Sequence, residues 1–243
     1  SDNMWIYSSA CDPEQSVNYI SAHDNFCLWD KIRVTLATSI TSAKYWGAEK
    51  TPPDSIDTLY SLVYDAAKDA YAMRINKFGT AMVLTSQGLP FIHAGDEFRR
   101  TKEISGDWSA TRNSYNSAIN FNMIRWQLKS SQSSMYSYYK NMVALRKAHP
   151  AFRMTTWDQI KSNVSVAQVP GKSVVIYSIN GAAVGDSWKK IIAVFNSDAN
   201  YSYTLPSGSW KVAVEKENAA VGGTVVSGSY TCEGTSATIF YQE

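Results

Sequence analysis

Val17-Asn18-Tyr19-Ile20-Ser21-Ala22-His23-Asp24-Asn25-Phe26-Cys27-Leu28-Trp29-Asp30 is the stretch that decides the fold class of this chain. Its apolar beginning predicts a strand that ends by placing His23, Asp24 and Asn25 together in a loop. In parallel α/β enzymes, catalytic side chains lie at the carboxyl ends of strands, where loops present them to a substrate. The stretch therefore predicts a candidate site. Because it stands close to the first residue, we expect further strands of the same site to lie upstream.

Helical periodicity follows this stretch. A first helix is predicted from Leu28, since apolar residues recur every four positions up to Ile40. A second apolar face runs from Leu59 to Val83 and is expected to end at Gly88, a plausible C′ glycine. Residues 88–95, opened by a proline and closed by a glycine, then predict a short buried strand. The order strand, helix, strand favours a parallel α/β arrangement.

The remaining chain divides into two kinds of sequence. Residues 96–134 lack periodicity and predict a binding loop, and a last helix is expected near Tyr138 to Leu145, stopped by Pro150. Beyond Thr155 come short β-rich segments separated by turn residues, which predict a small antiparallel β-sandwich. These segments are Val164 to Val169, Ser173 to Ile179, Ile191 to Phe195, Trp210 to Val214, Thr224 to Val226 and Thr238 to Tyr241. The predicted domains are residues 1–152 and 153–243.

Composition excludes several classes of protein. The formal net charge is only +2 and the sequence has no Lys/Arg run, so nucleic-acid binding has no obvious source of phosphate contacts. No apolar run reaches the length of a membrane span. Cys11, Cys27 and Cys232 lack metal-ligand spacing, so buried unpaired thiols are expected. The start has neither an initiator Met nor a signal peptide, and we expect the chain to be a piece of a longer protein.

Three segments carry a resemblance to a known family. The string from Val17 to Asn25, followed by Leu28-Trp29-Asp30, resembles the last conserved catalytic segment of pullulanase-type debranching enzymes of the α-amylase superfamily. Gln87-Gly88-Leu89-Pro90-Phe91-Ile92-His93-Ala94-Gly95-Asp96-Glu97-Phe98-Arg99-Arg100-Thr101-Lys102 is similar to their eighth barrel strand and its exit. Asn113-Ser114-Tyr115-Asn116-Ser117 looks like their downstream substrate loop. The matches occur in the right order over roughly residues 11–126.

The resemblance implies the last two strand and helix units of a (β/α)₈ TIM barrel, followed by an antiparallel β-sandwich. Such enzymes hydrolyse α-1,6-glucosidic branch points with retention, using a nucleophile, an acid/base and a third carboxylate that stabilises the transition state. Asp24 matches the third carboxylate, and His23 matches the histidine that contacts sugar hydroxyls. The segments that would carry the other two carboxylates are not in this sequence, so we expect the chain alone to be inactive.

Further side chains are candidates for substrate contact. They are Asn25, Arg99, Asn113, Tyr115 and Asn116. Amides match paired sugar hydroxyls, and a tyrosine ring can pack on a pyranose face. The sequence departs from the family after residue 117, where Ala118-Ile119-Asn120-Phe121 replaces the expected Pro-Asp stretch.

The two acidic residues after the second strand have a different expected role. The resemblance implies that Asp96 and Glu97 are architectural, with Arg99, Arg100 or Lys102 as partners in local ion pairs. Arg99 and Arg100 could instead reach substrate hydroxyls.

Alternative interpretations remain open from the residues alone. Asp24 could cap a helix that starts near Phe26, with His23 as a structural side chain. The chain could also be a non-catalytic carbohydrate-binding module or a structural module, since an incomplete barrel leaves open sheet edges. The expected partners are an α-glucan and the upstream part of the same polypeptide, with no nucleic acid and no membrane insertion. We expect no cofactor here, leave calcium in the whole enzyme open, and infer from the resemblance an extracellular or cell-surface location.

Overall fold

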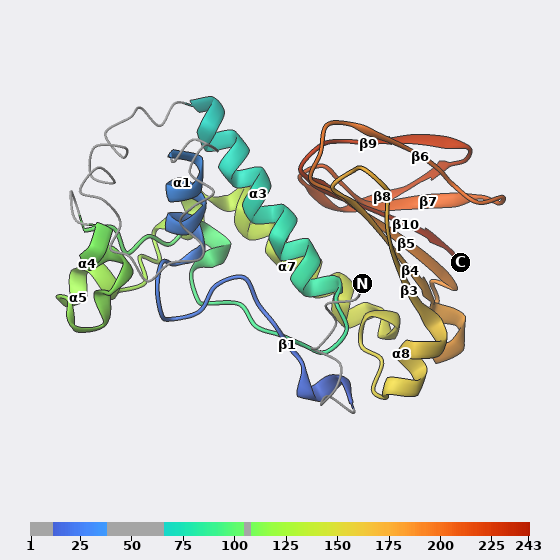
Figure 1. Ribbon diagram of the computed structural model, residues 1–243, viewed down its shortest axis with the longest axis horizontal. Helices are drawn as coiled ribbons and strands as arrows, with labels where there is room; N and C mark the ends of the chain where they lie inside the picture. The colour runs from blue at the N-terminus through green and yellow to red at the C-terminus, as the bar shows by residue number, and fades with distance from the viewer. Residues whose placement is uncertain (1–11, 38–65, 105–107) are drawn as a thin grey trace. The chain divides into compact units, whose positions relative to one another are not determined.

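Two short parallel strands and a large antiparallel sheet organise this mixed helix and sheet protein (Figure 1). The computed structural model describes residues 12–37, 66–104 and 108–243. The chain divides into two compact units. Unit 1 contains Ser1–Tyr19, Lys77–Phe91 and Ser137–Glu243, and unit 2 contains Ile20–Asn76 and Ile92–Tyr136.

The parallel pair lies in unit 1. Strand β1 (Val17–Asn18), which follows the short 3₁₀ helix η2 (Pro13–Gln15), pairs in parallel with β2 (Leu89–Pro90). The predicted order of strand, helix and strand is confirmed, but each strand is only two residues long. The prediction that residues 88–95 are buried is wrong, because Leu89 is 49% exposed. In the described part of the chain no third strand stands beside the pair to cover it.

Among the described residues between the two strands are helices α1 (Leu28–Ala37) and α3 (Ala66–Thr85). The predicted helix start at Leu28 is confirmed, and α3 confirms the second predicted helix. The apolar core around α1 lies in unit 2 and contains Leu28, Trp29, Ile32 and Ala72. Ile40, residues 59–63 and Cys11 lie outside the described residues.

The expected role of Gly88 as the C′ residue of α3 is wrong. Helix α3 ends at Thr85, so Gly88 stands beyond the cap position. Its φ is +91°, and a Cβ added there would lie 2.8 Å from the carbonyl oxygen of Ser16 and 2.9 Å from that of Pro13. Glycine is needed at this position because two backbone segments approach closely, not because a helix ends.

Arg146 binds backbone carbonyl oxygens at the end of α3. It lies on α7 (Ser133–Ala148), the last helix predicted from the sequence. Its guanidinium lies 3.0 Å from the carbonyl oxygen of Leu84, 2.8 Å from that of Ser86 and 2.7 Å from that of Gly88. The last carbonyls of a helix lack partners within the helix, so one buried side chain replaces a glycine cap.

The described residues of the predicted binding loop, 96–104 and 108–134, form short helical turns joined by brief connections. The turns are η4 (Asp96–Phe98), α4 (Trp108–Arg112), η5 (Ser114–Asn116), α5 (Ile119–Asn122) and α6 (Leu128–Ser131).

The antiparallel sheet of unit 1 has six strands in the order β3-β4-β5-β10-β7-β8. All of the β-segments predicted beyond Thr155 are confirmed. The short helix η6 (Pro150–Phe152) and helix α8 (Trp157–Asn163) precede the first strand of this sheet, and the short helix η7 (Gly181–Val184) lies between its second and third strands in the sequence. The strands are β3 (Val164–Gln168), β4 (Val174–Asn180), β5 (Lys190–Asn196), β7 (Trp210–Glu215), β8 (Asn218–Val226) and β10 (Ser236–Gln242).

A second, smaller sheet was missed by sequence analysis. Strands β6 (Tyr201–Thr204) and β9 (Ser229–Cys232) pair with each other and lie over the larger sheet in Figure 1. Their apolar residues share one core with the larger sheet, which makes the two layers of a sandwich. Buried members of this core are Val174, Ile192, Val194, Leu205, Trp210, Val212, Cys232 and Phe240.

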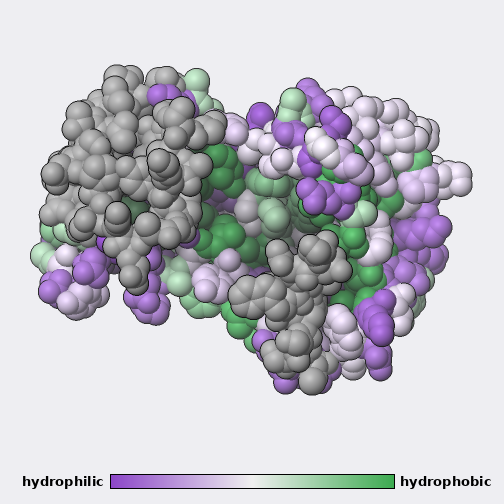
Figure 2. All heavy atoms as spheres, in the orientation of Figure 1, coloured by the Kyte–Doolittle hydropathy of each residue, from purple (hydrophilic) through white to green (hydrophobic). Residues whose placement is uncertain are grey.

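Apolar side chains also reach the surface. Hydrophobic residues lie among polar ones on the face drawn in Figure 2. In and beside the parallel pair, Val17 is 51% exposed and Tyr19 is 59% exposed. Cys27 and Cys232 are free buried thiols, as expected. Among the helices of the described ranges, none is both long enough and apolar enough to cross a membrane.

Candidate active site

His23, Asp24 and Asn25 lie in an exposed loop of unit 2. The side chains of His23 and Asp24 are 83% and 84% exposed, and His23 Nε2 lies 3.4 Å from Asp24 Oδ1. Asn25 has a φ of +63°, in the left-handed region that asparagine tolerates better than most residues. The loop therefore displays an imidazole and a carboxylate side by side, free to meet a ligand.

The interpretation of Asp24 as a helix cap is wrong. Helix α1 begins at Leu28, so the position before it is Cys27 and not Asp24. The N–H of Leu28 is instead hydrogen-bonded to Asp96, a residue of the segment after β2. Asp24 is thus left without this structural task.

Asp96 is buried and binds Ser21 and Leu28, which lie at the two ends of the loop that carries His23 and Asp24. Ser21 Oγ donates to Asp96 Oδ2 at 2.5 Å, and the N–H of Leu28 also donates to this carboxylate. Burial raises the pKa of Asp96 to about 6, although these two hydrogen bonds oppose the rise. The architectural role expected for Asp96 agrees with these contacts. The ion pairs expected between these acidic residues and Arg99, Arg100 or Lys102 do not form in the described part of the chain. Glu97 instead accepts a hydrogen bond from the N–H of Gly95.

Asp30 is a second buried carboxylate beside the same loop. It accepts hydrogen bonds from Cys27 Sγ at 2.9 Å, Thr101 Oγ1 at 2.6 Å and the N–H of Lys102 at 2.8 Å. Burial raises the pKa of Asp30, and the hydrogen bonds from Cys27 and Thr101 oppose that rise. Asp30 therefore fixes residues 101–102 against the first turn of α1.

Arg99 lies in a structural network. It forms an ion pair with Asp69, lies 3.2 Å from Gln132 Oε1, and stacks 3.8 Å above the ring of Trp29. Its side chain is only 18% exposed. These contacts favour a role in holding the segment after β2 over a direct sugar contact.

Arg100 connects this segment to the downstream turns. It donates to His93 Nε2 at 3.0 Å and to the carbonyl oxygen of Asn122. Burial, ahead of the charge of Arg100, lowers the pKa of His93 to about 4. The imidazole is therefore neutral near pH 7 and can accept the hydrogen bond from the guanidinium.

Asn113, Tyr115 and Asn116 are all exposed, and Tyr115 is 80% exposed. Ser114 between them is buried and donates to Asn122 Oδ1 at 3.0 Å, while Asn122 Nδ2 donates to the carbonyl oxygen of Ser114 at 2.6 Å. The hydrogen bonds between Ser114 and Asn122 thus fix the turn, while the side chains of Asn113, Tyr115 and Asn116 face solvent. Over the described residues, no hydrogen bond joins this turn to His23, Asp24 or Asn25.

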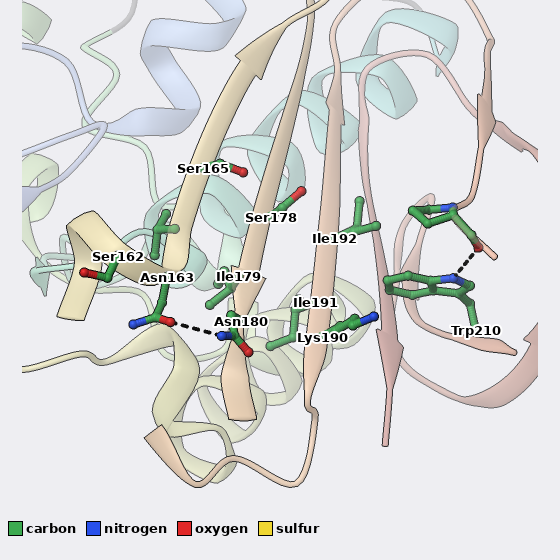
Figure 3. A pocket seen from close by; sticks show the side chains of 12 residues that line it. Ser162, Asn163, Ser165, Ser178, Ile179, Asn180, Lys190, Ile191, Ile192 and Trp210 are labelled. Carbon is green, nitrogen blue, oxygen red and sulfur yellow. Dashed lines mark hydrogen bonds between the residues drawn. The ribbon is translucent and has the colours of Figure 1, made fainter. Parts of the chain in front are cut away.

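A groove of about 420 Å³ lies on the sandwich in unit 1 (Figure 3). Hydroxyl and amide groups line it beside apolar side chains, and Asn180 Nδ2 donates to Asn163 Oδ1 at 3.1 Å. Trp210 is buried and donates through Nε1 to the carbonyl oxygen of Pro206 at 2.9 Å. None of the site residues predicted from the sequence lines this groove. In the described ranges, no group of His, Cys, Asp and Glu side chains has the arrangement of a metal site.

Known proteins similar to this chain include proteins named pullulanase and isoamylase. A family model described as the pullulanase all-beta domain matches residues 160–218. Pullulanase of Bacillus subtilis (strain 168) is 27% identical over 197 residues, which cover 81% of this chain and 23% of that protein. Isoamylase of Pseudomonas amyloderamosa is 28% identical over 213 residues, which cover 82% of this chain and 26% of that protein.

A solved structure extends the likeness to the fold. The structure of pullulanase from Anoxybacillus sp. LM18-11 complexed with maltotriose is 30% identical, with a TM-score of 0.72 over 96% of this chain and 28% of that one. The chain thus spans about a quarter of the length of each of these three relatives. The resemblance to pullulanase-type debranching enzymes that the sequence indicates is confirmed.

The network around Arg99 predicts a loss of stability in Arg99→Ala. The substitution leaves Asp69 without its cation and uncovers the ring of Trp29, so we expect about 1–2 kcal/mol of destabilisation for this partly exposed pair. Thermal unfolding of the 243-residue chain measures the effect. Arg112→Ala is the control, because Arg112 is exposed. Equal melting temperatures for the two variants would contradict the structural role.

Proposed function

We propose that this chain contributes part of the active site of a retaining glycoside hydrolase that cleaves α-1,6-glucosidic branch points in pullulan, starch or glycogen. The observation that carries this proposal is the exposed pair of His23 and Asp24 on a loop anchored at both ends. Proteins similar to the chain support it, since they are named pullulanase and isoamylase. The relatives crystallised with maltooligosaccharides support an α-glucan as the ligand.

Asp24 stabilises the transition state in this proposal. The sugar ring becomes positively charged as the glycosidic bond breaks, so a fixed carboxylate attracts the transition state more than the neutral substrate. The imidazole of His23 donates a hydrogen bond to a hydroxyl of the same sugar. Asn25, Asn113, Tyr115 and Asn116 contact neighbouring sugar units.

We further propose that β1 and β2 are two neighbouring strands of a (β/α)₈ barrel. Their parallel pairing supports this, as does the exposure of Val17, Tyr19, Leu89 and Phe91, which further strands would cover. Residues 1–152 then belong to the barrel and residues 153–243 to the β-sandwich. The upstream part of the same polypeptide completes the barrel and supplies the nucleophile and the acid/base.

A non-catalytic carbohydrate-binding module is the second candidate function, and the groove beside Asn163 and Asn180 favours it. Crystals soaked with maltohexaose separate the two. Sugar density beside Asp24 supports the remnant of an active site. Density confined to the groove supports the binding module.

The proposal predicts that the chain alone releases no reducing sugar from pullulan. Of the three carboxylates in the mechanism, the family resemblance assigns only Asp24 to this chain. We expect activity when the chain is mixed with the separately produced upstream segment, or when both are in one polypeptide. Hydrolysis by the 243-residue chain alone at high concentration would contradict this assignment.

Asp24→Asn tests the central residue in the complete polypeptide. The change removes the charge and keeps the size, so turnover is expected to fall about a hundredfold to a thousandfold. The melting temperature should not change, because the side chain is exposed. Asp158→Asn, an exposed aspartate on α8, is the matched control and should retain full activity. A turnover within about threefold of the parent would show that Asp24 is not catalytic.

Tyr115→Ala tests the substrate contact. With the ring 80% exposed, its removal should leave the melting temperature unchanged and raise KM for branched substrates about tenfold, the loss of about 1.4 kcal/mol of binding. Tyr115→Phe keeps the ring and should retain most of the affinity. If Tyr115→Ala lowers the melting temperature and leaves KM unchanged, the tyrosine supports the fold and does not bind sugar.

A further inference from the structure

The loop that carries His23 and Asp24 has little support of its own. Both side chains point into solvent, and in the described part of the chain no backbone–backbone hydrogen bond involves residues 22–25. Its ends are fixed, since Ser21 and Leu28 both bind Asp96. Something else must hold the middle of the loop if Asp24 is to keep one position.

Lys102 reaches into the middle of this loop. Its Nζ donates to the carbonyl oxygen of His23 at 3.0 Å. The residue is only 4% exposed. Its backbone is fixed as well, because its own N–H donates to Asp30 at 2.8 Å and Thr101 Oγ1 donates to the same carboxylate at 2.6 Å. The ammonium therefore stands at a defined place beneath the loop.

Burial lowers the pKa of Lys102, and the nearby charges of Asp30 and Asp24 oppose that change. Burying an ammonium group costs free energy unless the group binds polar atoms. The His23 carbonyl therefore stabilises the buried ammonium of Lys102, and Lys102 in turn holds the loop. Breaking this contact therefore disturbs both partners.

We propose that Lys102 is a positioning residue for Asp24, and that it acts by holding the His23 carbonyl from below. The inference rests on the proposed function, because it assumes that the place of Asp24 matters for turnover. Lys102 does not touch the substrate. It removes the alternative loop conformations in which Asp24 would be misplaced, and a displacement of about 1 Å can cost about a hundredfold in rate.

The test compares Lys102→Met with Lys102→Arg in the complete polypeptide. Methionine keeps most of the side-chain volume and removes the donor, whereas arginine keeps a cationic donor. We expect Lys102→Met to lower kcat about tenfold to a hundredfold with little change in KM, and to speed amide hydrogen exchange in the peptide covering residues 20–28. Lys102→Arg should recover part of both properties.

Lys31→Met is the matched control. Lys31 Nζ also donates to a backbone carbonyl, that of Ile20, at 2.9 Å. Ser21, the residue after Ile20, is held by its own hydrogen bond to Asp96, so the loss of the Lys31 contact should not displace the loop that carries Asp24. We therefore expect Lys31→Met to lower the melting temperature without lowering kcat.

Each outcome decides a separate point. If Lys102→Met lowers only the melting temperature, as the control does, Lys102 is structural and the proposal is overturned. Unchanged hydrogen exchange at residues 20–28 would overturn it equally. If the parent polypeptide does not cleave pullulan, the proposed function fails, and hydrogen exchange still decides whether Lys102 holds the loop.

Discussion

Two buried carboxylates are the constraint on which the candidate site depends. Asp30 and Asp96 both lie away from solvent, and each must receive hydrogen bonds to offset the loss of hydration. The donors come from two distant parts of the sequence: the loop ahead of α1 and residues 101–102. Satisfying the carboxylates therefore aligns the loop that carries Asp24 with the segment after β2. The exposed side chains of His23 and Asp24 thus depend for their position on buried carboxylates that need not contact a ligand.

The same principle operates in unit 1, where side chains meet backbone groups far away in the sequence. Asp186 accepts from the N–H of Ala151 at 2.9 Å and that of Trp188 at 2.8 Å, and it contacts His149 Nδ1 at 2.8 Å. Trp188 in turn stacks on His149 and Tyr241. One carboxylate thus fastens the end of α7 to the larger sheet of the sandwich.

The sequence predicts structure where a pattern is local and strong. Apolar spacing from Leu28 located α1, and β-branched runs located the strands of the large sheet. The strands β6 and β9 were missed although Tyr201 and Tyr203 alternate with polar residues, because each strand is only four residues long. The exposure of Leu89 could not be predicted, since it depends on which strands stand beside β2.

The site shows the same limit. The sequence predicted His23, Asp24 and Asn25 as site residues after the first strand, and Asn113, Tyr115 and Asn116 are exposed, as a ligand contact requires. The hydrogen-bond and ion-pair partners of the site residues could not be predicted from the sequence. Asp69 is thirty positions from Arg99, and Lys102 lies 79 positions from His23. No periodicity links residues so far apart, and only the fold brings them together.

Arg146 and Gly88 together set the length of one connection. The guanidinium binds carbonyls at three alternate positions, Leu84, Ser86 and Gly88, and the glycine lies against the backbone of Ser16. A residue added or removed between α3 and β2 would move these carbonyls out of step with the guanidinium. Changes in chain length during evolution should therefore gather elsewhere, as at the turn around Gly171, where a Cβ would meet open space.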